Sequence, residues 1–202
     1  MKIFLCWSGE RSRHVAKEFD EFLKDLNKKL PGLNNLFDPF RSANIEKGLP
    51  WFQAVESELA SAQAVLVTIT PENCESPMHY EAGAIANGMR IEMSRKGKRK
   101  ANVDTIKGRL FTYLFGMDAR ALKGPLAAYQ STAATYEDTR ALVRRLLTIA
   151  DAALPTGEQS EEDIAWEKQF RSCWNDFIER LRPCRHQQLA AWLRVLLTNS
   201  RG

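Results

Sequence analysis

The sequence predicts an α/β fold with a central parallel sheet flanked by helices, and three observations support this. Short apolar runs alternate with longer segments of helical periodicity through the first two thirds of the chain. One of these runs, Ala64 to Ile69 (AVLVTI), is β-branched and apolar on both faces, as in a parallel strand covered on both sides. The 202 residues, 44% of them hydrophobic, suffice for one domain with an elaboration.

The N-terminal part begins with an apolar run over residues 2–7, which predicts a buried strand. Ser8 and Gly9 interrupt it, and residues 10–29 then predict an amphipathic helix that ends at Pro31-Gly32. The apolar face of this helix is formed by Val15, Phe19, Phe22, Leu26 and Leu30. Residues 35–40, with Leu-Phe-Asp at 36–38, predict a second short strand, followed by a polar loop.

The middle part repeats the pattern. Pro50 stands at the first turn of a predicted helix, because its fixed φ and missing N–H are tolerated there. The strand over residues 64–69 follows, and a polar loop then leads to a helix that carries Tyr80 and Glu81. Residues 110–115 (LFTYLF) predict a fourth strand.

The C-terminal part is helical. Gly124-Pro125 predicts a turn, and residues 137–153 predict a helix with one apolar face. We therefore divide the chain into a domain over residues 1–153 and an extension over residues 154–202. The extension contains two predicted helices, 164–181 and 187–197, which either pack on the first domain or form an oligomer contact.

The positive charge belongs to one segment. The chain has 29 Lys and Arg against 25 Asp and Glu, for a net charge of +4. Residues 90–107 hold seven of the basic and two of the acidic residues, so the rest of the chain is slightly acidic. No aromatic residue interrupts this segment to stack on bases, so we expect no DNA or RNA partner. A solvated loop is one interpretation, and a contact with an acidic partner or a substrate diphosphate is the other.

The N-terminus has no secretory apolar region, and no run approaches the roughly 18 apolar residues that a membrane span needs. The four cysteines (Cys6, Cys74, Cys173 and Cys184) form no CxxC pair and no metal-ligand spacing with the three histidines. We therefore expect reduced structural thiols, no bound metal, no membrane contact and a cytoplasmic location.

The carboxyl ends of parallel strands place three loops at one edge of the sheet, where α/β proteins bind ligands. These loops are residues 7–9, 38–51 and 70–81. They contain two indoles, a serine and a carboxylate, Glu81, near a predicted helix start. A carboxylate with aromatic neighbours suits cleavage of a glycosidic bond, because it stabilises an oxocarbenium-like state. The alternatives are that Trp7 is core, Trp51 fixes its helix, Ser8 caps a helix and Asp38 is a turn residue.

The motifs, taken in order, resemble a bacterial Toll/interleukin-1 receptor (TIR) domain over about residues 1–150. The stretch FLCWS (4–8) resembles the first strand and loop of that family, and the segment from Phe37-Asp38 to Trp51 is similar to its second strand and BB loop. AVLVTITP (64–71) resembles the third strand, and SPMHYEAGA (76–84) the acid-bearing helix. Residues 110–116 and 124–130 are similar to the later part of bacterial members.

The resemblance implies a flavodoxin-like TIR fold and cleavage of the nicotinamide–ribose bond of NAD⁺. Glu81 matches the family's catalytic acid, and Trp7, Ser8, Asp38, Trp51 and Tyr80 are the candidate substrate contacts. The products would be nicotinamide and either ADP-ribose or a cyclic ADP-ribose-type signal, as in bacterial anti-phage defence. NAD⁺ is then a substrate, no cofactor is needed, and the partners are further copies of the chain and a separate effector.

Two other functions stay open. In many family members a tryptophan lies four residues before the catalytic acid, whereas this chain has Pro77 there. This departure favours a non-enzymatic TIR interaction module. A nucleoside deoxyribosyltransferase-like enzyme, which also uses a catalytic glutamate and shares the strand–helix order, is the third hypothesis.

Overall fold

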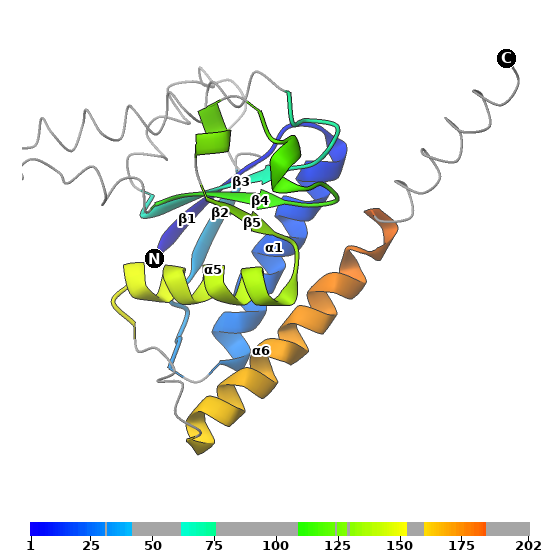
Figure 1. Cartoon of the computed structure of the whole chain (residues 1–202). Helices are drawn as coiled ribbons and strands as arrows, with labels where there is room; N and C mark the ends of the chain where they lie inside the picture. The colour runs from blue at the N-terminus through cyan, green and yellow to red at the C-terminus, as the bar shows by residue number, and fades with distance from the viewer. Residues whose placement is uncertain are drawn as a thin grey trace, which may run out of the picture.

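The protein folds around a five-stranded parallel sheet (Figure 1). This computed structural model describes residues 1–30, 32–41, 62–75, 109–123, 125–128, 130–152 and 160–184. The strands are β1 (Lys2–Cys6), β2 (Asp38–Arg41), β3 (Ala64–Ile69), β4 (Leu110–Leu114) and β5 (Ser131–Ala133). Their spatial order is β2-β1-β3-β4-β5, the flavodoxin-like order, and all four pairings are parallel. The predicted α/β class with a central parallel sheet is confirmed.

The central strands β1, β3 and β4 are largely buried on both faces, as the unbroken apolar strand β3 predicts. Side chains alternate between the faces, so Leu5 and Leu66 lie in one core cluster while Phe4 and Val67 lie in the other. The helices α1 (Glu10–Lys29), α5 (Tyr136–Ile149) and α6 (Glu161–Arg180) contribute to the first cluster. The segment that follows β4, with the short helices η2 (Ala119–Ala121) and η3 (Pro125–Ala128), contributes Leu122 and Leu126 to the second.

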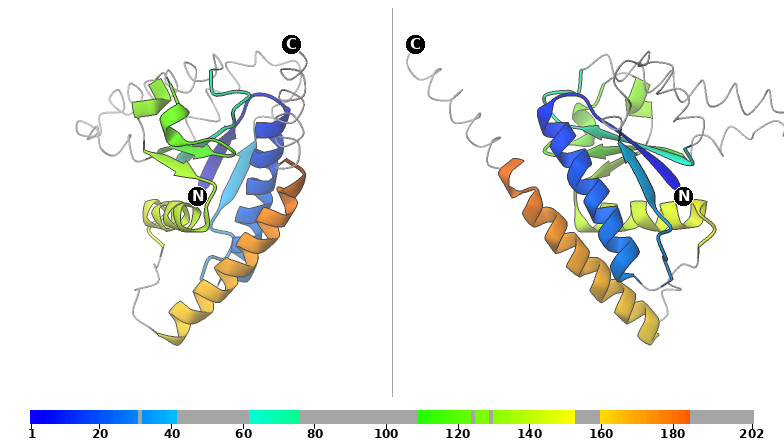
Figure 2. Two further views of the ribbon diagram at one scale, coloured as in Figure 1. Left: turned by 45° about the vertical axis from the view of Figure 1, so that its right-hand side comes forward. Right: turned by 180° about the vertical axis from the view of Figure 1, so that it is seen from behind.

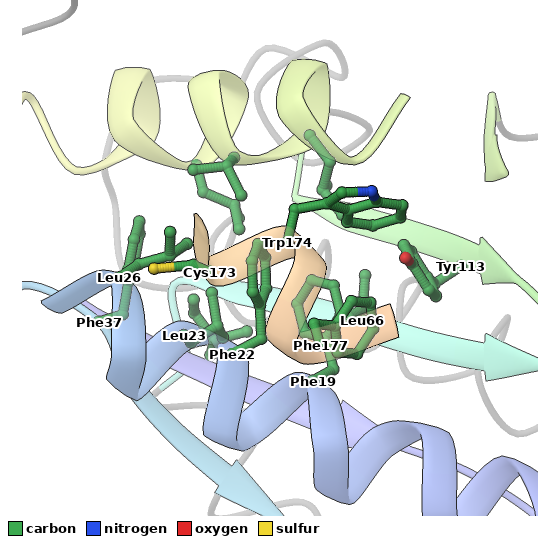
Figure 3. Packing of buried hydrophobic residues seen from close by; sticks show 14 of the residues in the cluster. Phe19, Phe22, Leu23, Leu26, Phe37, Leu66, Tyr113, Cys173, Trp174 and Phe177 are labelled. Carbon is green, nitrogen blue, oxygen red and sulfur yellow. The ribbon is translucent and has the colours of Figure 1, made fainter. Parts of the chain in front are cut away.

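Helix α6 runs antiparallel to α1 along its length (Figure 2). Its apolar stripe enters the same core cluster as β1, β3 and β4. Phe177 is fully buried, and its ring centroid lies 5.8 Å from that of Phe19 on α1 and 6.4 Å from that of Tyr113 on β4 (Figure 3). Helix α6 is therefore part of the core of the sheet domain.

Two strand predictions need correction. The second strand was expected within residues 35–40, centred on 36–38, but β2 occupies Asp38–Arg41. The side chain of Asn27 accepts from the Phe37 N–H at 3.0 Å and donates to the Phe37 carbonyl at 2.6 Å, so this residue's main-chain groups are engaged outside the sheet. Strand β5 was not predicted, because its three small residues, Ser-Thr-Ala, carry no apolar periodicity.

The other elements within the described ranges agree with their predictions to within a few residues at each end. The predicted helices after Pro50, around Glu81 and over residues 187–197 lie outside the described residues, as does the basic segment 90–107. The four thiols are free, as expected. Within the ranges that the structure describes, no helix is both long enough and apolar enough to cross a membrane.

A polar cluster joins α5 to α6. The Tyr136 hydroxyl donates to Glu167 Oε1, and Arg140 Nε donates to Glu167 Oε2 at 2.8 Å. Burial raises the pKa of Glu167, but the hydrogen bonds from Tyr136 and Arg140 outweigh it, and the pKa lies below its usual value. Burial and the hydrogen bond to Glu167 raise the pKa of Tyr136 to about 12. This cluster is strongest when Glu167 is ionised and Tyr136 is neutral.

We expect this cluster to lose stability in strongly alkaline solution. The pKa of Tyr136 is raised from 10.0 to about 12 on folding, so the unfolded chain releases this proton first. The stabilisation is complete below about pH 10 and is lost as the pH rises through about 12. Chemical denaturation of the wild type and of Tyr136→Phe should give free energies of unfolding whose difference shrinks across this window. A difference that stays constant from pH 10 to 12 would contradict the assignment.

Candidate functional site

The strand order places a ligand-binding position between β1 and β3. In folds with this strand order, the connections that follow β1 and β3 run in opposite directions along the sheet. A crevice therefore forms outside the carboxyl ends of these two strands. The two strands are parallel, and the register pairs Cys6, the last residue of β1, with Val67, two residues before the end of β3, so both strands end at the same edge. We call the residues that follow the strands here the carboxyl-edge site: Trp7, Ser8, Arg11, Ser12, Glu72 and Asn73.

The loop after β1 is tightly bonded to the first turn of α1. Gly9 occupies the N-cap position at φ 87°, a conformation that glycine adopts without a Cβ clash. Ser12, which is buried, donates from its hydroxyl to the Ser8 carbonyl at 2.5 Å and accepts from the Ser8 N–H at 3.1 Å. Ser8 is therefore held through its main chain, and the cap position that the sequence suggested for it belongs to Gly9.

The loop after β3 is closed by Asn73. This residue is 4% exposed, and its Oδ1 accepts from the Thr70 N–H at 2.7 Å. The Asn73 N–H in turn donates to the Thr70 carbonyl at 3.1 Å, which completes a tight turn over residues 70–73. The same side chain donates from Nδ2 to the Ser8 carbonyl at 2.9 Å and to the Thr68 carbonyl at 3.2 Å. Asn73 thus links the loops after β1 and β3.

Arg11 connects the loops after β3 and β4. Its guanidinium donates to Glu72 Oε1 at 2.6 Å and lies 5.4 Å from the ring centroid of Phe115, the residue after β4. Burial raises the pKa of the Glu72 carboxyl, but the hydrogen bonds from Arg11, Thr70 and the main chain, with the charge of Arg11, together outweigh it, and the pKa lies below its usual value. Glu72 is therefore an ionised partner of Arg11 near neutral pH and is not poised as a proton donor.

The C-terminal end of α6 approaches the same edge. The Arg180 carbonyl lies 3.3 Å from His14 Nε2, one turn beyond the start of α1. Burial raises the pKa of the Cys184 thiol, while the nearby charge of Arg11 acts in the opposite direction. This thiol is therefore protonated near neutral pH, which fits a structural role.

The structure brings together two of the six candidate residues. Trp7 and Ser8 are both half-buried and follow β1 at the carboxyl edge. Asp38 begins β2 and pairs with Lys2, four residues before the end of β1, which is about 13 Å along the strand. It lies at the opposite edge of the sheet, so the structure does not place it with Trp7 and Ser8. Trp51, Tyr80 and Glu81 lie outside the described residues.

Four residues of the carboxyl-edge site were not predicted from the sequence: Arg11, Ser12, Glu72 and Asn73. A signal was present for Asn73, because Thr-Pro-Glu-Asn directly after a strand is rich in turn-forming residues. Arg11 had no such signal, since its partners lie about 60 and 100 residues away. In the ranges that the structure describes, no group of three His, Cys, Asp or Glu side chains is placed to hold a metal ion.

These features define an α/β protein with the flavodoxin-like strand order and a hydrogen-bonded polar site where β1 and β3 end. Comparison with known proteins finds no protein-family model that matches the chain and no match among curated proteins.

Proposed function

We propose that the protein is a TIR-type NAD⁺ nucleosidase or cyclase that cleaves the nicotinamide–ribose bond. The observation that carries the proposal is the position of Trp7 and Ser8 beside the loop after β3. In the TIR family, which the sequence resembles, the first loop contacts the nucleotide, and the loop after the third strand leads to the catalytic acid. Both loops start at the position where this strand order binds ligands.

Glu81 is the proposed catalytic residue. It follows Glu75, the last described residue of the loop after β3, by six positions. A carboxylate beside the ribose stabilises the positive charge that develops as nicotinamide leaves. Water, or a nucleophile within the remaining ADP-ribose, then completes hydrolysis or cyclisation.

The N-terminal end of α1 suits an anionic substrate. It follows the loop after β1 and carries the partial positive charge of a helix start. The full charge of Arg11 at the same place is balanced by the Glu72 carboxylate. We propose that NAD⁺ is bound as a substrate with no further cofactor, that copies of the chain associate through TIR-type surfaces, and that a cyclic product would act on a separate effector in anti-phage defence.

The test is product analysis with purified protein at high concentration, or with a crowding agent to favour assembly. NAD⁺ and deoxynucleosides are supplied in separate reactions, and the products are resolved by chromatography. We expect nicotinamide release from NAD⁺ that falls by about 100-fold or more in Glu81→Gln, because the charge that stabilises the transition state is lost.

Glu75→Gln is the matched control for this substitution. Glu75 lies six residues earlier, is exposed, and has Lys123 at 3.9 Å as a partner. Removal of its charge should leave turnover unchanged. Equal turnover in Glu81→Gln and the wild type would remove Glu81 from the mechanism.

Two other results would identify the alternatives. Pro77, in place of the tryptophan of many family members, favours the interaction module, which predicts no turnover of either substrate. Release of free base from deoxynucleosides, with NAD⁺ left intact, would indicate the deoxyribosyltransferase-like enzyme.

A further inference from the structure

Asn73 differs from the other polar residues of the carboxyl-edge site, because its side chain bonds to both loops at once. Its Oδ1 accepts from Thr70 within the loop after β3, and its Nδ2 donates to the Ser8 carbonyl across the gap between the loops. The two contacts join main-chain groups 62 residues apart in sequence, and the side chain that makes them is 4% exposed.

Hydrogen bonds in such a buried position define a geometry. The Asn73 amide is buried, and an N–H of Nδ2 that lost the Ser8 carbonyl would retain its desolvation cost, so the bonded arrangement is favoured over any that separates the loops. The Ser8 carbonyl also accepts from the Ser12 hydroxyl, and the Ser8 N–H donates to the Ser12 hydroxyl oxygen. The chain Ser12–Ser8–Asn73–Thr70 is thus a continuous hydrogen-bonded connection from the start of α1 to the loop after β3.

We infer that Asn73 is a positioning residue of the carboxyl-edge site, which holds the Ser8 loop in register with the chain segment that leads to Glu81. This inference rests on the proposed function. Asn73 acts through the position of the Ser8 loop and not by contact with the reacting atoms. Its contribution is to keep the two halves of the site at one separation, and a displacement of about 1 Å between reacting groups can cost on the order of 100-fold in rate.

A substitution at Asn73 can remove the donor of its side-chain amide and keep the acceptor. Asn73→Asp retains an acceptor for the Thr70 N–H but replaces the Nδ2 donor with a second acceptor. The bonds to the Ser8 and Thr68 carbonyls are then lost, while the turn over residues 70–73 is kept. The measurements are made at about pH 8, where an aspartate is ionised.

Asn27 provides a matched control. Its side chain makes the same kind of double contact, accepting from the Phe37 N–H at 3.0 Å and donating to the Phe37 carbonyl at 2.6 Å. Phe37 directly precedes β2, at the edge of the sheet opposite to Ser8. Asn27→Asp therefore breaks an equivalent bridge away from the carboxyl edge.

The first measurement compares the kinetics of nicotinamide release. For Asn73→Asp we expect kcat to fall by about 10-fold to 100-fold while KM changes by less than about 3-fold, because each half of the site still contacts the substrate. Asn27→Asp should keep the wild-type kcat, even at an equal loss of stability. If both variants lose kcat in proportion to their loss of stability, Asn73 is a structural residue and the inference is wrong.

The second measurement does not depend on activity. Crystal structures of the wild type and of Asn73→Asp should show the Ser8 main chain displaced by about 1 Å relative to Thr70, with the turn over residues 70–73 unchanged. Asn27→Asp should leave this separation as it is. If the wild type releases no nicotinamide, the proposed function fails, and the separation of Ser8 and Thr70 alone decides whether Asn73 positions this loop. An unchanged separation in Asn73→Asp would overturn the inference whatever the activity.

Discussion

Replacement of Phe177 by alanine is expected to lower the free energy of unfolding by about 3–5 kcal/mol. Phe177 is fully buried, and its ring packs against Phe19 and Phe22 of α1 with centroid distances of 5.8 and 5.0 Å. It also approaches Tyr113 of the sheet, so one side chain connects three elements. Alanine would remove these contacts and leave a cavity that the surrounding rings cannot fill.

Urea denaturation followed by circular dichroism measures this loss. Ile164→Ala on the same helix is the control, because Ile164 is 61% exposed and should change the free energy of unfolding by less than about 0.5 kcal/mol. Phe177→Leu keeps most of the volume and should cost less than about 1.5 kcal/mol, which retains a measurable transition if the alanine variant does not fold. Equal effects of Phe177→Ala and Ile164→Ala would show that α6 is not part of the core.

Replacement of Arg180 by methionine is expected to cost about 2–3 kcal/mol. Arg180 Nε lies 2.9 Å from Glu18 Oε2, and its Nη1 donates to Asp25 Oδ2 at 3.2 Å. The side chain of Glu18 is only 7% exposed, so the loss of Arg180 leaves a buried carboxylate with Lys17, at 3.6 Å, as a partner. The expected cost is below that of a fully buried pair because the Arg180 side chain is about one third exposed to water.

The exposed pair between the same two helices is the control. Lys29 Nζ lies 2.9 Å from Asp176 Oδ2, with side chains 37% and 51% exposed. Lys29→Met should cost less than about 1 kcal/mol, since water solvates the remaining carboxylate. Guanidinium is unsuitable as the denaturant because its ions screen charges, so urea is used at low salt. Similar losses for Arg180→Met and Lys29→Met would contradict the role assigned to the burial of Glu18.

Helix α6 is thus attached to α1 by an apolar stripe and by ion pairs at two points along its length. Apolar residues recurring at helical spacing predicted the helix itself. The sequence did not predict what this helix packs against, because an amphipathic helix packs as well against its own domain as against another subunit. The complementary positions of Glu18 and Arg180, 162 residues apart, are visible only after folding.

The local elements were predictable because their signals are local. Helix α1 has its apolar residues at three- and four-residue steps, and β3 is apolar on both faces. Strand β5 was not predicted and the start of β2 was predicted too early, because both depend on contacts between residues far apart in the sequence. Ser131–Ala133 is a strand because it pairs with β4, and Phe37 lies outside β2 because Asn27 engages its main chain.

The candidate site divides in the same way. Trp7 and Ser8 were found because they follow a strong strand signal, and the rule for parallel sheets places such residues at a ligand-binding edge. Asp38 was assigned to that edge as a residue after the second strand, whereas it is the first residue of β2 and lies at the opposite edge. A shift of a few residues in a strand boundary therefore moved a candidate residue across the sheet.

The sequence by itself determined the α/β class, the order of the main elements and the strand ends near which polar residues gather. These follow from periodicity and turn chemistry, which act over a few residues. The tertiary structure decided the strand order, the incorporation of α6 into the core and the bridge from Asn73 to Ser8. Those features depend on contacts between residues far apart in the chain, and such contacts form only when the whole sheet brings their donors, acceptors and apolar faces together.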